Sequence, residues 1–158
     1  MFDQIMGLPM HVLLVHAAVV FVPLLATAAV VYAVVPRLRN RVGWVAALLA
    51  VGAPVAALSA KLSGDAFRDR RAAGGAPAQS LATIDAHGAF GTLTFWTSLA
   101  LGLITGALVI VTQRGRRERN LPMWIDVVLG GLAVVLAAVS TYYVFRTGDS
   151  GAKSVWGS

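Results

Sequence analysis

The sequence contains no cysteine and few charged residues: of its 158 positions 13% are charged, whereas 58% are hydrophobic. Soluble domains carry about a quarter charged residues, so this composition excludes an ordinary soluble protein. Without thiolates the chain cannot ligate an iron–sulfur cluster through cysteine, attach a c-type haem covalently or form a disulfide. Any cofactor must therefore be bound by other side chains.

Acidic residues are scarcer than basic ones, with 7 Asp and Glu against 13 Lys and Arg and a formal net charge of +6. A nucleic-acid partner would need these cations on one contiguous face. They lie instead in short clusters between apolar runs, as in the loops of membrane proteins, so we expect no nucleic-acid binding. Metalloprotease, hydrolase and phosphate-loop motifs are also absent, and the sequence identifies no enzyme.

Long uncharged stretches organise the chain. There are four of them, at residues 4–36, 42–60, 86–113 and 127–145. About 20 apolar residues cross a hydrocarbon core of about 30 Å. The sequence therefore predicts an all-α protein: one integral membrane domain over 1–158, an antiparallel up-down-up-down four-helix bundle embedded in the lipid bilayer. Its helices are expected near 9–35, 42–62, 86–112 and 122–146.

Arginine clusters predict the orientation of the bundle. The first expected turn carries Arg37, Arg39 and Arg41, and the third carries Arg114, Arg116, Arg117 and Arg119. The positive-inside rule places both turns in the cytoplasm and both termini on the outer side of a bacterial cytoplasmic membrane. The middle segment, 63–85, is expected to be a flexible surface loop, and 147–151 has a turn-like composition.

Small and acidic residues within the spans suggest local roles. Gly102 and Gly106, and the pair Gly130 and Gly131, should let neighbouring helices approach closely; whether the protein forms a homo-oligomer stays open. Asp126 is an acid inside an expected span. It is predicted to pair with the neighbouring arginines at 116, 117 and 119 or with the N-terminal dipole of its helix, and a proton-relay carboxylate is the alternative.

The three histidines, His11, His16 and His87, fall near the outer ends of the first and third expected helices. An imidazole at membrane depth is a candidate functional group, since burying it is costly. His11 and His16 are five residues apart, so a regular helix separates them by roughly 140° and about 7.5 Å of rise. A compact metal site would need a distorted helix, whereas a haem needs one axial ligand from each of two helices. We expect a b-type haem held by His16 and His87, with His11 as the substitute ligand.

Four arginines are expected at the level of the histidines and could pair with haem propionates: Arg68, Arg70, Arg71 and Arg146. Each could equally extend to the interface or bind lipid phosphate. Asp85 is expected to cap the third helix.

Two other classes of function stay open at this point. The first is a transition-metal centre for zinc, copper or iron, with imidazole and carboxylate ligands drawn from His11, His16, His87 and Asp149. The second is a non-catalytic accessory subunit whose histidines only pack between helices.

Three motifs carry a resemblance over nearly the whole chain: Gly-Leu-Pro-Met-His-Val-Leu-Leu-Val-His at 7–16, Asp-Ala-His-Gly-Ala-Phe-Gly at 85–91, and Gly-Asp-Ser-Gly-Ala-Lys-Ser-Val-Trp at 148–156. The sequence resembles a bacterial family of predicted four-helix membrane proteins, the domain of unknown function 2231. His11, His16, His87 and Gly91 match the motifs of that family, and Asp149 stands where a histidine is expected.

The resemblance implies a layout similar to that of small two-haem membrane cytochromes. It also implies redox work near the outer membrane face, with a redox protein or a larger membrane complex as partner. Since Asp149 replaces the expected fourth histidine, the sequence favours a single b-type haem or a metal site of three histidines and a carboxylate over two haems.

Overall fold

Four long helices account for nearly all of the chain in this computed structural model, which describes residues 4–5, 8–118 and 122–156. Two short strands, β1 (Gln4–Ile5) and β2 (Leu8–Pro9), pair antiparallel before the first helix. The helical elements are α1 (Met10–Val34), the 3-10 turn η1 (Pro36–Leu38), α2 (Arg39–Ala73), α3 (Ala78–Glu118) and α4 (Met123–Trp156). The predicted all-α four-helix bundle is confirmed.

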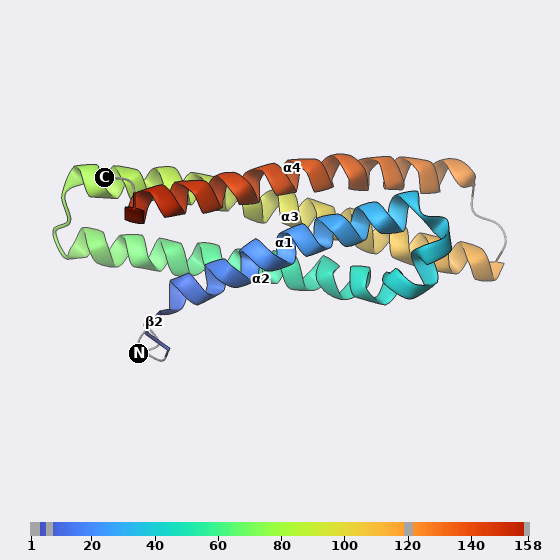
Figure 1. Ribbon diagram of the computed structural model, residues 1–158, viewed down its shortest axis with the longest axis horizontal. Helices are drawn as coiled ribbons and strands as arrows, with labels where there is room; N and C mark the ends of the chain where they lie inside the picture. The colour runs from blue at the N-terminus through green and yellow to red at the C-terminus, as the bar shows by residue number, and fades with distance from the viewer. Residues whose placement is uncertain (1–3, 6–7, 119–121, 157–158) are drawn as a thin grey trace.

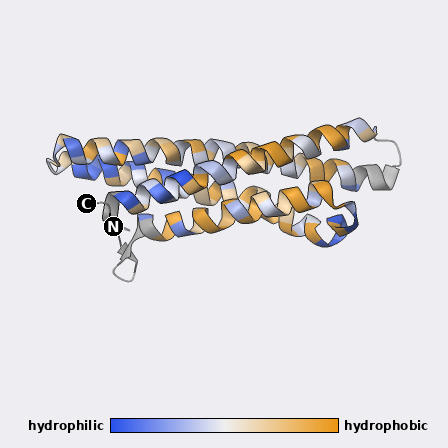
Figure 2. Cartoon of the chain, turned by 45° about the horizontal axis from the view of Figure 1, so that its top comes forward, coloured by the Kyte–Doolittle hydropathy of each residue, from blue (hydrophilic) through white to orange (hydrophobic). Residues whose placement is uncertain are grey.

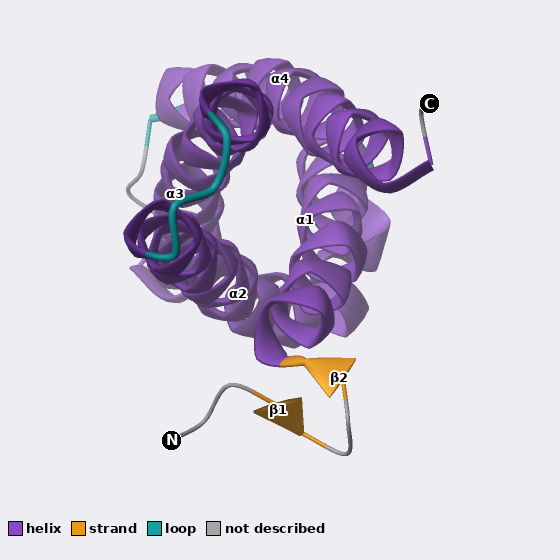
Figure 3. Cartoon of the chain, turned by 90° about the vertical axis from the view of Figure 1, so that its left-hand side faces the viewer, coloured by secondary structure: helices purple, strands orange, loops and turns teal. Residues whose placement is uncertain are grey.

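Consecutive helices run in opposite directions along the long axis (Figure 1). Viewed from one end, they form a ring in which α1 contacts α2 and α4, and α3 lies across from α1 (Figure 3). The described starts of α1 and α3 and the ends of α2 and α4 lie at one end, here called the histidine end. The turn from α1 to α2 lies at the other, here called the Arg39 end.

Each of the four helices is long and apolar enough to cross a membrane, with candidate spans at Leu13–Val34, Pro36–Ala73, Ala78–Gln113 and Met123–Lys153. Hydrophobic residues dominate the middle of the bundle, and hydrophilic residues gather towards its ends (Figure 2). Large apolar side chains also point outward: Val51, Leu103 and Val135 are each at least 60% exposed. An outer surface of this kind suits lipid, and the chain is an integral membrane protein.

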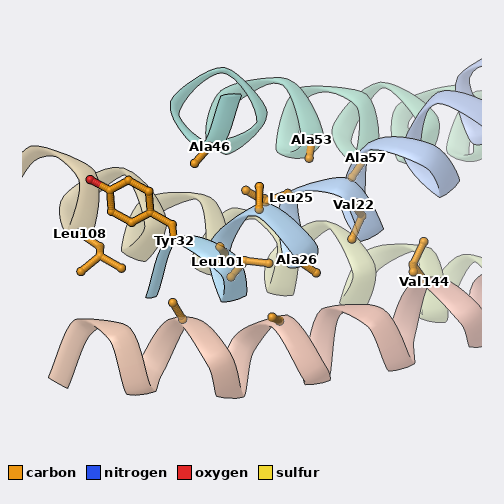
Figure 4. Close-up of a cluster of buried hydrophobic side chains, with 14 of the residues drawn as sticks. Val22, Leu25, Ala26, Tyr32, Ala46, Ala53, Ala57, Leu101, Leu108 and Val144 are labelled. Atoms are coloured by element: carbon orange, nitrogen blue, oxygen red, sulfur yellow. The ribbon is translucent and has the colours of Figure 1, made fainter. Parts of the chain in front are cut away.

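The interior is built from residues that alternate four and three positions apart, the spacing that keeps one face of a helix against its neighbours in an antiparallel bundle. We call these the core positions. Part of this core is shown in Figure 4. The buried members are Ala18, Val22, Leu25, Ala29 and Tyr32 on α1; Arg39, Gly43, Ala46, Ala53, Ala57 and Ala60 on α2; Thr94, Ser98, Leu101, Thr105 and Leu108 on α3; and Ala133, Ala137, Ser140, Val144 and Thr147 on α4.

Arg39 of α2 contacts both α1 and α4 at the Arg39 end. Its Nε and a terminal nitrogen donate to the carbonyl oxygens of Tyr32 and Ala33, at 2.9 and 3.2 Å, and so satisfy acceptors in the last turns of α1. Its other terminal nitrogen lies 2.8 Å from Asp126 Oδ2, in the first turn of α4. Asp126 therefore pairs with Arg39, whereas the side chains at 116, 117 and 119 lie outside the described residues.

Three helices, α2, α3 and α4, are longer than expected, and the predicted flexible loop at 63–85 is wrong. Only residues 74–77 interrupt the helical structure there, with Gly75 at a φ of 75° in the turn. Lys61 and Asp65 form an i,i+4 ion pair at 2.6 Å, which supports α2 beyond its apolar part. The composition of 147–151 suggested a turn, but that segment lies within α4.

The extended hairpin changes the role of Asp85. Because α3 begins at Ala78, Asp85 lies in its second turn and is not the cap that we expected. It accepts two hydrogen bonds from Arg68, at 2.9 and 3.2 Å. These bonds connect α2 to α3. At 1.5 Å per residue α2 and α3 measure roughly 52 and 61 Å, well beyond a hydrocarbon core of about 30 Å. The turn between them therefore projects from the membrane.

Gly102 lies at a close approach of α2 and α3. A Cβ there would collide with the carbonyl oxygen of Ala50 and lie 3.1 Å from Pro54 Cγ. The expected close approach is thus present at Gly102. At Gly106, outside its own stretch of helix, no described atom lies within 4 Å of such a Cβ.

We expect Gly102→Ala to destabilise the bundle by about 1–3 kcal/mol, since a backbone carbonyl cannot yield and the helices must separate. The matched change Gly106→Ala should be neutral or stabilising by up to about 1 kcal/mol, because alanine favours helix. Thermal unfolding followed by circular dichroism in one detergent compares the two. Equal melting temperatures for both variants would contradict the close contact.

Candidate functional site

His11 lies in the first turn of α1 and reaches across to α2. Its Nδ1 lies 2.8 Å from Ser63 Oγ, and the Ser63 hydroxyl donates to the Ala60 carbonyl oxygen at 2.8 Å. A hydroxyl has one proton, so Ser63 Oγ must accept the bond from the imidazole Nδ1–H. The neutral ring is thereby fixed as the Nδ1–H tautomer, and its lone pair lies on Nε2.

His87 repeats this arrangement between α3 and α4. Its Nδ1 lies 2.9 Å from Ser150 Oγ, whose hydroxyl donates to the Thr147 carbonyl oxygen at 3.0 Å. The same one-proton argument makes Nδ1 the donor and leaves the lone pair on Nε2. Each helical hairpin thus contributes one imidazole with the same tautomer.

A glycine follows each serine and supports the ring. A Cβ at Gly64 would lie 3.1 Å from His11 Cε1, and a Cβ at Gly151 would lie 3.1 Å from His87 Cε1. Both distances are tighter than ordinary carbon contacts, so glycine lets each imidazole lie against the facing helix. The sequence singled out neither Ser-Gly pair as functional. The signal that could have found them is the repetition of Ser-Gly near the ends of α2 and α4.

The two imidazoles lie at the same end of the bundle, His11 at the start of α1 and His87 in the early part of α3 (Figure 1). His11 lies just outside the spanning segment that begins at Leu13. Burial lowers the pKa of His11, although hydrogen bonding to the Ala60 backbone opposes this shift. The ring is therefore neutral near physiological pH, the form in which imidazole binds a metal.

His16 occupies a different face of α1. Continuing the core positions of α1 backwards from Ala18 gives residues 15 and 11, so His11 shares the core face and His16 does not. His16 is exposed, whereas His11 and His87 are partly buried. The imidazole that lies with His87 is accordingly His11, which the spacing of the buried residues could have indicated.

The arginines expected beside the site have varied surroundings. Arg68 is engaged by Asp85, and Arg70 is exposed. Arg71 lies over the ring of Phe67, 6.0 Å from its centroid, and that ring is parallel to His11 with centroids 6.4 Å apart. Arg146 lies over a phenylalanine ring of α3, 5.0 Å from its centroid.

Asp149, expected as a possible metal ligand, forms an ion pair within its own helix. Its Oδ2 is 2.8 Å from Lys153 Nζ, one turn further along α4. Among the described residues, no three side chains of histidine, aspartate or glutamate form a group that could hold a metal ion.

The fold and these contacts define an integral membrane four-helix protein with two hairpins, each holding one oriented imidazole. A family model described as predicted membrane protein (DUF2231) matches residues 7–158, and the chain belongs to this family. No curated protein and no solved structure gives a significant match.

The tautomers can be read directly from the nitrogen NMR signals of imidazole in cofactor-free protein. We expect Nδ1–H rings for His11 and His87 at neutral pH. Ser63→Ala should shift only the His11 signals towards the other tautomer, and Ser150→Ala only those of His87, because each change removes one acceptor. The His16 signals serve as the internal control. Nε2–H rings in the unchanged protein would contradict the assignment.

Proposed function

We propose that the protein binds a b-type haem between His11 and His87 and transfers electrons at its histidine end. The observation that carries this proposal is the pair of imidazoles whose Nδ1–H groups are both held by serine, leaving both Nε2 atoms as ligands. A haem takes one axial ligand from each of two helices, which matches one histidine on α1 and one on α3.

The residues around the pair have distinct tasks in this proposal. Ser63 and Ser150 fix the tautomer and raise the basicity of each Nε2, as outer partners of metal-bound histidines do. Gly64 and Gly151 set the position of each ring. When bound, the haem iron would accept and release one electron. Arg71 and Arg146 are the cations best placed to meet propionates, since Arg68 is engaged by Asp85.

The same proposal assigns a side of the membrane. Arginines concentrate at the Arg39 end, which favours a cytoplasmic location for that end and an outer location for the haem. The turn between α2 and α3 then projects on the outer side of a bacterial cytoplasmic membrane. A soluble redox protein or a larger membrane complex could contact it there.

Haem binding is tested by visible spectra of protein purified in mild detergent from haem-supplied cells. We expect a reduced-minus-oxidised spectrum with a sharp b-type α band. His11→Ala and His87→Ala should each lower the haem content to background, because each removes one of two axial ligands. His16→Ala is the matched control and should keep the haem.

Two results would overturn this proposal. A featureless spectrum in haem-supplied cells excludes a cytochrome, and a stoichiometric zinc, copper or iron ion without Soret absorption would indicate a metal-ion centre. Loss of haem in His16→Ala with retention in His11→Ala would instead assign the ligand to His16.

The supporting glycines provide a second prediction. Gly64→Ala and Gly151→Ala should each weaken haem binding by about ten- to a hundred-fold, the usual effect of disturbing groups that orient a metal-bound histidine. Gly148→Ala is the control on α4, since outside its own stretch of helix no described atom lies within 4 Å of a Cβ there. Titration of haem into cofactor-free protein measures all three. Unchanged affinity in both test variants would contradict the proposed ring positions.

A further inference from the structure

Hydroxyl groups occupy core positions of α3 and α4 through the depth of the bundle. Ser98, Thr105 and Ser140 have no exposed surface, and Thr94 and Thr147 are 3% and 9% exposed. A membrane bundle can fill such positions with alanine and leucine, as α1 and α2 mostly do. Five buried hydroxyls therefore need an explanation beyond apolar packing.

Two of these hydroxyls lack a partner. Among the described residues, Thr105 Oγ1 and Ser140 Oγ are buried without a hydrogen bond, whereas Ser98 Oγ donates to the Phe95 carbonyl oxygen at 2.9 Å. An unpaired polar atom in an apolar interior is costly. Buried water is the usual partner of such atoms in proteins.

The spacing of the hydroxyls leaves gaps of the size that one or two water molecules span. Thr94 Oγ1 and Thr147 Oγ1 lie 2.8 Å apart and fix which residues of the antiparallel helices α3 and α4 share a level. Counting seven residues from each brings Ser140 to the level of Leu101. At 1.5 Å per residue, Ser98 and Thr105 then lie roughly 4.5 and 6 Å from Ser140 along the axis. Because each hydrogen bond to water spans about 2.8 Å, one water can bridge the shorter gap and the longer gap needs at least two.

The line of hydroxyls continues to the Arg39 end. Thr112 lies seven residues after Thr105, roughly 10.5 Å along α3, a gap for two or three waters. Its hydroxyl donates to Leu108 and lies 2.6 Å from the Tyr32 hydroxyl. Tyr32 packs against Arg39, which binds Asp126. Asp126 Oδ1 is a third buried oxygen without a partner among the described residues, on a carboxylate whose side chain is 35% exposed.

We propose that these hydroxyls and the waters between them form a proton path through the bundle, from Asp126 at the Arg39 end to Thr94 and Thr147 near the histidine end. A proton enters at the Asp126 carboxylate while another leaves to water at the histidine end. Each hydroxyl and water in between accepts one proton and donates one, so no charge accumulates in the path. Water carries the proton between Asp126 and Tyr32, because the Arg39 guanidinium keeps its protons. This function is separate from haem binding and does not require it.

The test is proton flux into vesicles containing the purified full-length protein and a trapped pH-sensitive dye, driven by a potassium gradient with valinomycin. We expect flux above that of protein-free vesicles. Thr105→Val and Ser140→Ala should each lower the flux, and the double variant should lower it by about ten-fold, equivalent to about 1.4 kcal/mol in the barrier. The control variant Thr141→Val removes an exposed hydroxyl that donates to the Ala137 carbonyl oxygen of its own helix and should leave the flux unchanged.

Flux no greater than in protein-free vesicles, or an equal flux in the double variant and the unchanged protein, would overturn the proposal. Melting temperatures give an independent reading. In a dry core, replacing an unpaired hydroxyl by an apolar group of the same shape is neutral or stabilising. A double variant that melts higher would therefore indicate a dry core and also overturn the path. In a hydrated core the double variant loses bonds to water, and we expect it to melt lower.

Discussion

The spacing of the core positions is the constraint on which the rest of the structure depends. All four helices place their buried residues four and three positions apart, with Ala50 of α2 only partly buried, so each keeps one face inward over its spanning length. His11 and His87 lie on the same faces, one at the start of α1 and one early in α3. Ser150 and Gly151 follow the last buried position of α4, Thr147. The bundle and the imidazole pair therefore arise from one periodic pattern.

Within that pattern the four helices contribute different kinds of side chain to the core. The core face of α2 consists almost entirely of alanine and glycine, which allows the contact at Gly102. The core faces of α3 and α4 carry the hydroxyls, and α1 supplies larger apolar groups such as Leu25 and Tyr32. The outward faces are apolar on every helix. Polarity is thus concentrated inside and at the ends, the inverse of a soluble bundle and the arrangement that lipid favours.

The sequence predicted the number of helices and their spanning segments because lipid forbids charge over about 20 residues. It failed at the helix ends, where the charged segment after residue 62 suggested a loop. The ion pairs Lys61–Asp65 and Arg68–Asp85 instead stabilise helix beyond the bilayer. The sequence singled out the three histidines and preferred His16 for its depth along the helix, whereas His11 is the one that lies on the buried face of α1. The serines that fix the tautomers could not be predicted as partners, since they lie 52 and 63 residues away in the chain.

The two imidazole–serine pairs have a further consequence for how the protein is made. Each pair lies within a single hairpin, α1 with α2 and α3 with α4, so each can form as soon as that hairpin has entered the bilayer and before the hairpins associate. The amino-terminal hairpin leaves the ribosome first and carries its oriented histidine alone. A ligand that contacted both rings could therefore bind only after the second hairpin had docked against the first.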